Sequence, residues 1–301
     1  MAKTSSGDPP LDSLRREIDE IDEQIHDLIM RRAAIAGAVR KVKTDAGDGR
    51  GFIRPAREAE ILRRLAARHD GVFPDALIVR IWREIISATL ALETDFAVSV
   101  FVPEDVKTGL AYEWLARGYF GVETPVRAAR TESGVLRAVR DGKAAVGVLP
   151  VPSDDRFSHD EIPWWTTLAA GGEGRPMIMA RLPWRHGPED VIAGLEALAV
   201  SCVQPEPSGD DVSYLALRFA APVSRDKVGG ALKVAGLPMI GAVVANPRAS
   251  RGDPDWQLFE VDGFVADGDE RLDGFAAAME DAVDGIVVLG GYARPPRGTE
   301  L

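Results

Sequence analysis

The stretch LDSLRREIDEIDEQIHDLIMRRAAIAGAVRKVK, residues 11–43, decides the fold of the first part of the chain. Its apolar side chains recur in alternating steps of three and four residues, which predicts one long helix that packs against other helices along a seam. The seam residues are Leu11, Leu14, Ile18, Ile21, Ile25, Leu28, Ile35, Val39 and Val42. Arg32 takes the seam position between Leu28 and Ile35, where another apolar side chain is expected.

A guanidinium keeps its charge and is costly to bury without an anion that accepts its hydrogen bonds. Arg32 therefore indicates that the seam binds an anionic ligand. Two alternatives are an ion pair with an acid on a neighbouring helix, or a side chain that reaches out to solvent.

Arg15 and Lys43 flank the seam on the same face of this helix. At 1.5 Å of rise per residue they lie roughly 42 Å apart, whereas Arg32 and Lys43 lie about 16 Å apart. Two long side chains can converge over the shorter distance but not over the longer one. We therefore expect Arg15 to serve another site, or to reach the Arg32 and Lys43 of a second copy in an antiparallel dimer.

Two further helices are predicted, one that begins near Pro55 and one over residues 74–94. The apolar stripe of the third helix becomes polar near its end, where two polar residues four positions apart share one face. The polar residues singled out on these helices are Arg57, Glu58, Thr89 and Glu93.

Residues 11–94 resemble the all-helical (type II) chorismate mutases. The family's cations match Arg15, Arg32, Lys43 and Arg57, and the acid after the last of them matches Glu58. The family's Ser is Thr89, its Gln is Glu93, and Arg54 replaces an Asp that many members carry. The resemblance implies an all-α three-helix subunit in an intertwined homodimer, with chorismate as the substrate.

Chorismate rearranges to prephenate in one pericyclic step, which requires no cofactor and no metal. The resemblance implies that Arg32 and the partner subunit's Arg15 hold the two substrate carboxylates in the reactive conformation. Each charge-assisted contact contributes about 1.5–3 kcal/mol. Lys43 and a protonated Glu93 would donate to the ether oxygen, where charge develops only in the transition state.

The remaining residues have supporting roles by the same resemblance. Glu58 would accept a hydrogen bond from the substrate hydroxyl, and Thr89 would help to bind a carboxylate. Arg57 would position Glu58 or the ligand. Since every expected catalytic residue precedes Thr94, the helical segment is predicted to be active without the rest of the chain.

Composition narrows the class of protein. The 301 residues carry a net charge of −11 and a pI near 5.0, without a basic stripe, so a nucleic-acid partner is not expected. The single Cys202 cannot form an intrachain disulfide. The polar residues 1–10 and the lack of a long apolar run predict a cytoplasmic protein without a membrane partner.

After residue 95 the pattern changes to short apolar runs that alternate with helices. We predict three domains: 1–95 all-helical; 96–207 α/β and two-lobed, with a mostly parallel sheet in the lobe that ends near residue 149; and 208–301 an α+β ferredoxin-like module. The last has the order βαββαβ. A second and third domain of this kind resemble the dehydratase and ACT regions of bifunctional chorismate mutase/prephenate dehydratases.

The polar motifs of those two regions are eroded. The family's Thr-Arg-Phe aligns with Gly174-Arg175-Pro176, which lacks the hydroxyl that assists loss of the leaving group. Leu289-Gly290-Gly291-Tyr292 resembles the ACT module, but the family's Glu-Ser-Arg-Pro reads Ala245-Asn246-Pro247-Arg248. The sequence therefore predicts an isomerase, a chorismate mutase of aromatic amino acid biosynthesis, with a degenerate prephenate dehydratase-like region and an ACT-like module. The alternatives are a bifunctional mutase/dehydratase and a non-catalytic protein that senses aromatic metabolites or binds a partner.

Overall fold

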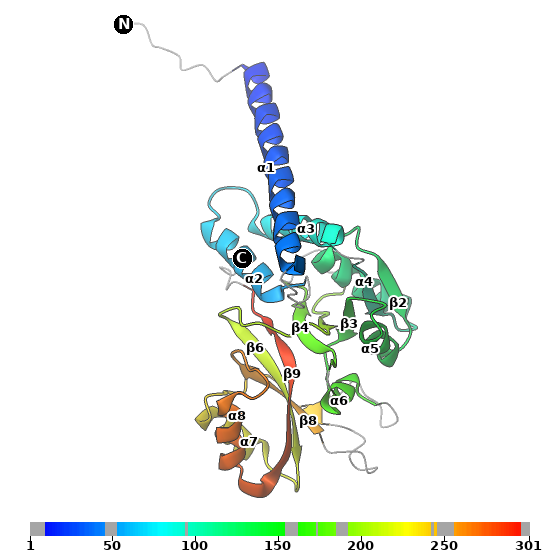
Figure 1. Cartoon of the computed structure of the whole chain (residues 1–301), viewed down its shortest axis with the longest axis vertical. Helices are drawn as coiled ribbons and strands as arrows, with labels where there is room; N and C mark the ends of the chain where they lie inside the picture. Colours follow the sequence, from blue (N-terminus) through cyan, green and yellow to red (C-terminus); the bar gives the residue numbers. More distant parts are fainter. Residues whose placement is uncertain are drawn as a thin grey trace, which may run out of the picture. The chain divides into compact units, whose positions relative to one another are not determined.

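The computed structural model describes residues 10–45, 53–93, 96–153, 162–172, 174–184, 192–241, 244–245 and 256–295. The helices are α1 Leu11–Asp45, α2 Pro55–Arg68, α3 Asp75–Glu93, α4 Val106–Phe120, α5 Glu132–Arg140, α6 Trp164–Ala169, α7 Arg225–Val234 and α8 Glu270–Ala278. The strands are β1 Val98–Phe101, β2 Val126–Ala129, β3 Val146–Pro150, β4 Met177–Leu182, β5 Ala197–Ser201, β6 Asp211–Phe219, β7 Val244–Ala245, β8 Trp256–Asp262 and β9 Val283–Ala293. The predicted fold class, helices followed by an α/β region and a ferredoxin-like region, is confirmed (Figure 1).

The chain divides into two compact units, Met1–Gly49 and Arg50–Leu301. The first unit contains α1, a single helix of 35 residues. The second contains α2, α3 and all that follows. The structure thus divides the chain before α2, whereas the sequence analysis places its first boundary at residue 95.

The physical reason for this difference is a hydrophobic core that α2 and α3 share with the sheet. Leu62 of α2 and Leu90 of α3 are buried in one cluster with Val98 of β1, Tyr119 of α4 and Met179 of β4. Pro55 at the first position favours the start of α2, and Ala56, Ala59 and Leu62 lie on its buried face.

The strands form one mixed sheet in the order β2-β1-β3-β5-β4-β9-β6-β8-β7, over the part of the chain that is described. β1 pairs in parallel with β2 and β3, whereas β5 is antiparallel to both β3 and β4. The parallel pairs of β1, β2 and β3 confirm the expectation of a mostly parallel sheet in the lobe up to residue 149. The antiparallel strand β5 belongs to the second lobe. The antiparallel pairs arise because the chain between β4 and β5 returns without a crossover helix among its described residues.

The ferredoxin-like order βαββαβ is confirmed by β6-α7-β7-β8-α8-β9. β9 pairs with β6 along its length and meets β4 at Gly290. Gly290 has φ +100°, and a Cβ there would collide with the backbone of Ile178. The glycine pair Gly290-Gly291 therefore lets one sheet run continuously across the predicted boundary at residue 207 (Figure 1).

Candidate active site

The three cations on α1 lie along one uninterrupted helix, as predicted. The side chain of Arg15 is 66% exposed and pairs with Asp12 at 3.5 Å. Arg32 is half-buried, and this burial lowers the pKa of its guanidinium. The side chain of Lys43 lies outside the described residues.

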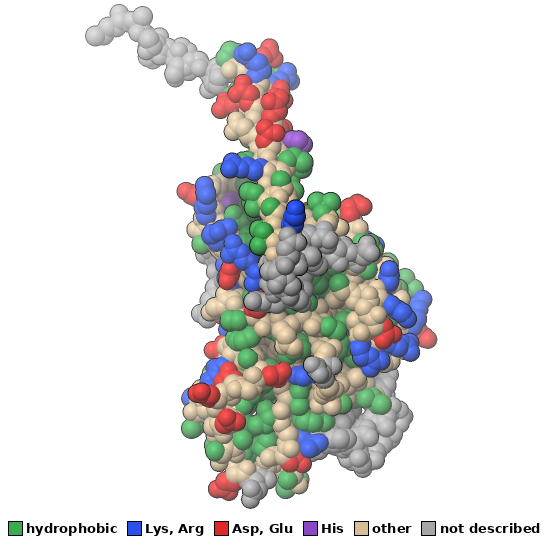
Figure 2. All heavy atoms as spheres, in the orientation of Figure 1, with side chains coloured by type: hydrophobic (Ala, Val, Ile, Leu, Met, Phe, Trp, Pro, Cys, Tyr) green, Lys and Arg blue, Asp and Glu red, His purple; other side chains and the backbone are tan. Residues whose placement is uncertain are grey.

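The apolar seam of α1 is exposed at all nine predicted positions. The exposed fractions range from 40% at Leu14 to 69% at Val42. Figure 2 shows hydrophobic side chains at the surface of this helix. In proteins a helix gains most of its stability when its apolar face packs against another surface, so the exposed seam indicates a site of packing.

Arg57 and Glu58 are neighbours on α2 but lie in different surroundings. Arg57 is exposed and donates to Glu60 at 2.8 Å, one turn along the same helix. Glu58 is 15% exposed in its side chain and accepts from Nη1 of Arg83, on α3, at 2.8 Å. Burial raises the pKa of Glu58, and the charge and hydrogen bond of Arg83 act in the opposite direction.

Thr89 and Glu93 lie four residues apart at the end of α3. The Thr89 hydroxyl donates to the carbonyl oxygen of Ile85 at 2.7 Å, a bond within its own helix. The side chain of Glu93 lies outside the described residues.

The seven candidate residues are therefore divided between the two units. Arg15, Arg32 and Lys43 belong to the first, and Arg57, Glu58, Thr89 and Glu93 to the second. Their assembly into one site stays a prediction.

Arg83 is a functional candidate that the sequence analysis missed. It is 2% exposed, and it lies on the same helical stripe as the packed residues Val79 and Leu90. The rule that singled out Arg32, a cation in an apolar seam, also applies to Arg83. The signal was present in the sequence. The apolar residues Ile81 and Trp82, which precede Arg83, were assigned to the buried face of this helix, so Arg83 was not singled out.

Arg175, which the sequence analysis aligns with the Arg of the family's Thr-Arg-Phe motif, is bound within the fold. Its Nη2 donates to the carbonyl oxygen of Val288 at 2.6 Å and lies 3.5 Å from Asp267. Gly174 before it has φ +72°, a conformation that disfavours a Thr. Position 174 therefore lacks a hydroxyl in its side chain, and its backbone conformation also disfavours a residue that would carry one.

The helical segment of this chain has relatives among known proteins. Residues 14–94 match the chorismate mutase type II family. The bifunctional chorismate mutase/prephenate dehydratase of Pseudomonas aeruginosa is 37% identical over 147 residues, which is 47% of this chain and 38% of that protein. The match is longer than residues 14–94, so it includes part of the remaining chain. The expected resemblance to this class of proteins is confirmed.

This chain spans less than half of the length of that relative. Among solved structures, prephenate dehydratase from Streptococcus mutans is 11% identical with a TM-score of 0.47, over 67% of this chain and 99% of that one. A quorum quenching acylase, GqqA, is 16% identical with a TM-score of 0.47, over 66% of this chain and 96% of that one. No helix within the described residues has the length and apolar character needed to span a membrane.

Proposed function

We propose that this protein is a chorismate mutase that works as a homodimer, and that α1 of each subunit delivers Arg15 to the site of the other. The observation that carries the activity is the row of cations on α1, within a segment that matches the type II mutases. A dianion with two carboxylates is the class of substrate that such cations bind.

The exposed seam of α1 supports the dimer. Nine large apolar side chains along one helix face need a complementary apolar surface, and a second copy of the same helix supplies one of equal length. Because Arg15 and Lys43 stand at opposite ends of α1, an antiparallel pair brings the Arg15 of one chain toward the Lys43 of the other.

In this mechanism Arg32 and the partner subunit's Arg15 hold the substrate carboxylates, with Thr89 assisting. Glu58 accepts from the substrate hydroxyl, and Arg57 positions Glu58 or the ligand. Lys43 and protonated Glu93 stabilise the charge that develops on the ether oxygen as the C–O bond breaks. The chain's own residues supply every group that this reaction needs. The cytoplasmic location predicted from the sequence belongs to the same proposal.

The experiment that tests the activity follows the loss of chorismate absorbance with the purified full chain. Wild-type protein should consume chorismate catalytically, and a double variant Arg32→Ala/Lys43→Ala should not. Equal loss of chorismate with and without the wild-type protein would overturn the proposal and favour the non-catalytic, metabolite-sensing alternative.

A second candidate function is a bifunctional mutase and dehydratase, because curated relatives carry both names. Gly174 and the bound Arg175 argue against it. Prephenate that is added directly should not be consumed by the protein. Phenylpyruvate should therefore form at neutral pH only at its spontaneous rate. Formation that rises in proportion to the protein concentration would establish the second activity.

A further inference from the structure

Arg83 is enclosed by side chains from α2 and from the predicted second domain, residues 96–207. Glu58 on α2 accepts from its Nη1 at 2.8 Å. The centre of the guanidinium lies 3.7 Å from the ring centroid of Tyr119, on α4, and 5.1 Å from that of Trp184, just after β4. Arg83 therefore connects the helical pair α2–α3 to the dehydratase-like region.

This surrounding holds the guanidinium with few hydrogen bonds. Nε and Nη2 of Arg83 and Nε1 of Trp184 are buried and have no hydrogen-bond partner among the described residues. Aromatic faces can hold a desolvated cation, so the two rings take the place of the missing acceptors. Among the described residues, the carboxylate of Glu58 is the anion that pairs with Arg83. The electrostatic attraction of this buried cation therefore acts mainly on Glu58.

The contact leaves part of Glu58 available. Among the described residues, the hydrogen bond from Arg83 reaches Oε2, and the side chain keeps 15% of its surface exposed. Oε1 is therefore the oxygen that can accept from a substrate hydroxyl. A fixed Oε2 also restricts the rotation of the carboxylate, which lowers the entropy lost when a substrate binds.

We propose that Arg83 is a positioning residue for the mutase reaction, held by Tyr119 and Trp184 of the dehydratase-like region so that Glu58 presents one carboxylate oxygen to the substrate. The inference rests on the proposed function. It assigns a use to a region whose own catalytic motifs are eroded: its aromatic residues support the site on α2. It also implies that the helical segment, which is expected to be active without the rest of the chain, is less active than the full chain.

The first test compares Arg83→Gln with Arg83→Lys in the full chain. The groups that face Glu58 among the described residues are Arg83 and Tyr119. Burial already raises the pKa of Glu58, so loss of the facing cation should raise it further. An acceptor works only when ionised; hence the acidic limb of kcat/KM should move to higher pH in Arg83→Gln, with a loss of about tenfold at pH 7.

Arg83→Lys keeps the charge and should keep the wild-type limb, with part of the activity restored. A purely structural role would lower the folded fraction of both variants without moving the limb. Matching pH profiles for wild type and folded Arg83→Gln would overturn the proposal.

The second test changes the dehydratase-like region and does not depend on the folding of the Arg83 variants. Tyr119→Leu removes one aromatic face from Arg83, and Tyr119→Phe keeps it. Tyr112→Leu is the matched control, since Tyr112 is buried on the same helix and packs against Phe101. We expect Tyr119→Leu to move the acidic limb upward and to lower kcat/KM severalfold per folded molecule, and Tyr119→Phe to restore both.

Tyr112→Leu should destabilise the fold to a similar degree and leave the limb in place. If Tyr119→Leu and Tyr112→Leu move the acidic limb of kcat/KM equally, or if neither variant moves it, the aromatic residues do not act through Glu58. If the proposed function itself is wrong, wild-type protein will not turn over chorismate at any pH. That result differs from each outcome that would overturn the role of Arg83.

Discussion

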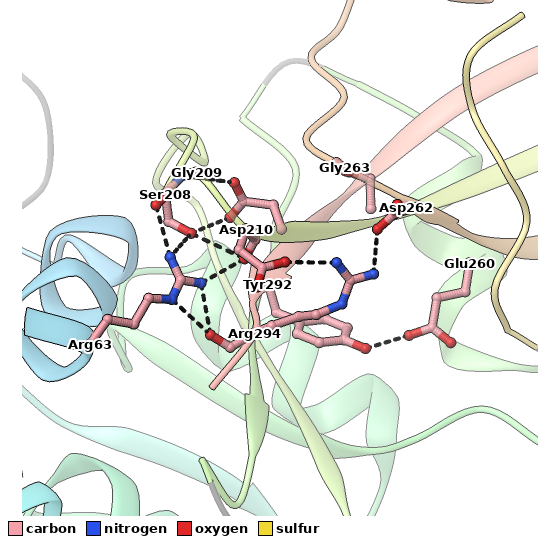
Figure 3. A network of polar contacts seen from close by, with 11 residues as sticks. Arg63, Ser208, Gly209, Asp210, Glu260, Asp262, Gly263, Tyr292 and Arg294 are labelled. Atoms are coloured by element: carbon pink, nitrogen blue, oxygen red, sulfur yellow. Dashed lines mark hydrogen bonds and ion pairs between the residues drawn. The ribbon is translucent and has the colours of Figure 1, made fainter. Parts of the chain in front are cut away.

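Arg63 on α2 and Arg294 after β9 are joined by hydrogen bonds although they stand 231 residues apart. Nη2 of Arg63 donates to the carbonyl oxygen of Arg294 at 2.7 Å and to that of Asp210 at 2.6 Å (Figure 3). Nη1 donates to the carbonyl oxygen of Ser208 at 2.8 Å. The Arg294 side chain in turn binds Asp210 and Asp262. A helix within the segment that matches the mutase family is thereby fixed to the ferredoxin-like module.

Arg63→Ala should lower the free energy of unfolding by about 2 kcal/mol, because several carbonyl oxygens lose a charged donor at once. The exposed Arg64 on the same helix provides the matched control, and Arg64→Ala should change stability by about 0.5 kcal/mol at most. Denaturant unfolding of both variants measures the difference. Equal midpoints would mean that water replaces the bonds of Arg63 without loss.

Arg32→Ala should lower kcat/KM for chorismate by about tenfold to hundredfold in a protein that stays folded, since one charge-assisted contact contributes about 1.5–3 kcal/mol. Arg31, exposed beside it on α1, is the control, and Arg31→Ala should retain wild-type turnover. Steady-state kinetics with circular dichroism of both variants make the comparison. Near wild-type turnover by Arg32→Ala would remove this residue from the site.

Mixed subunits test whether Arg15 crosses between chains. Arg15→Ala and Arg32→Ala proteins, each of low activity, should regain activity when unfolded together and refolded, because one of the two sites in a heterodimer keeps both arginines. Arg32→Ala mixed with Lys43→Ala is the control: both residues belong to the same site, so neither site in that heterodimer is complete. If the first mixture exchanges subunits and stays as inactive as the control, the cross-chain assignment is wrong.

Glu93 at the end of α3 predicts a basic limb in the pH profile. A carboxyl donates to the ether oxygen only while protonated, and the ionised form repels the charge that develops there. Activity should therefore fall as pH rises through the pKa of Glu93. Glu93→Gln donates at any pH and should preserve turnover at pH 8. Superimposable profiles of kcat against pH for the two proteins would place Glu93 outside the site.

The elements of this fold could be predicted because their signals are local. The three- and four-residue steps of the apolar seam predict α1, Pro55 marks the start of α2, and the alternation of β-rich runs with helices predicts the βαββαβ module. The candidate cations on α1 were found for the same reason, since a charge that interrupts an apolar period is visible in the sequence alone.

The sequence by itself determined the three N-terminal helices, the alternating strands and helices up to residue 149 and the order of the βαββαβ module. It also determined the match of the helical segment to the mutases. The tertiary structure alone decided that α2 and α3 share a core with the sheet, and that Glu58 pairs with Arg83, 25 residues away. It also decided that Arg63 binds the carbonyl oxygens of residues 208, 210 and 294. Hydrophobic periodicity reports which face of a helix is buried, but not which surface covers that face. Partners distant along the chain are selected by the packing of the whole unit, and no local pattern records that selection.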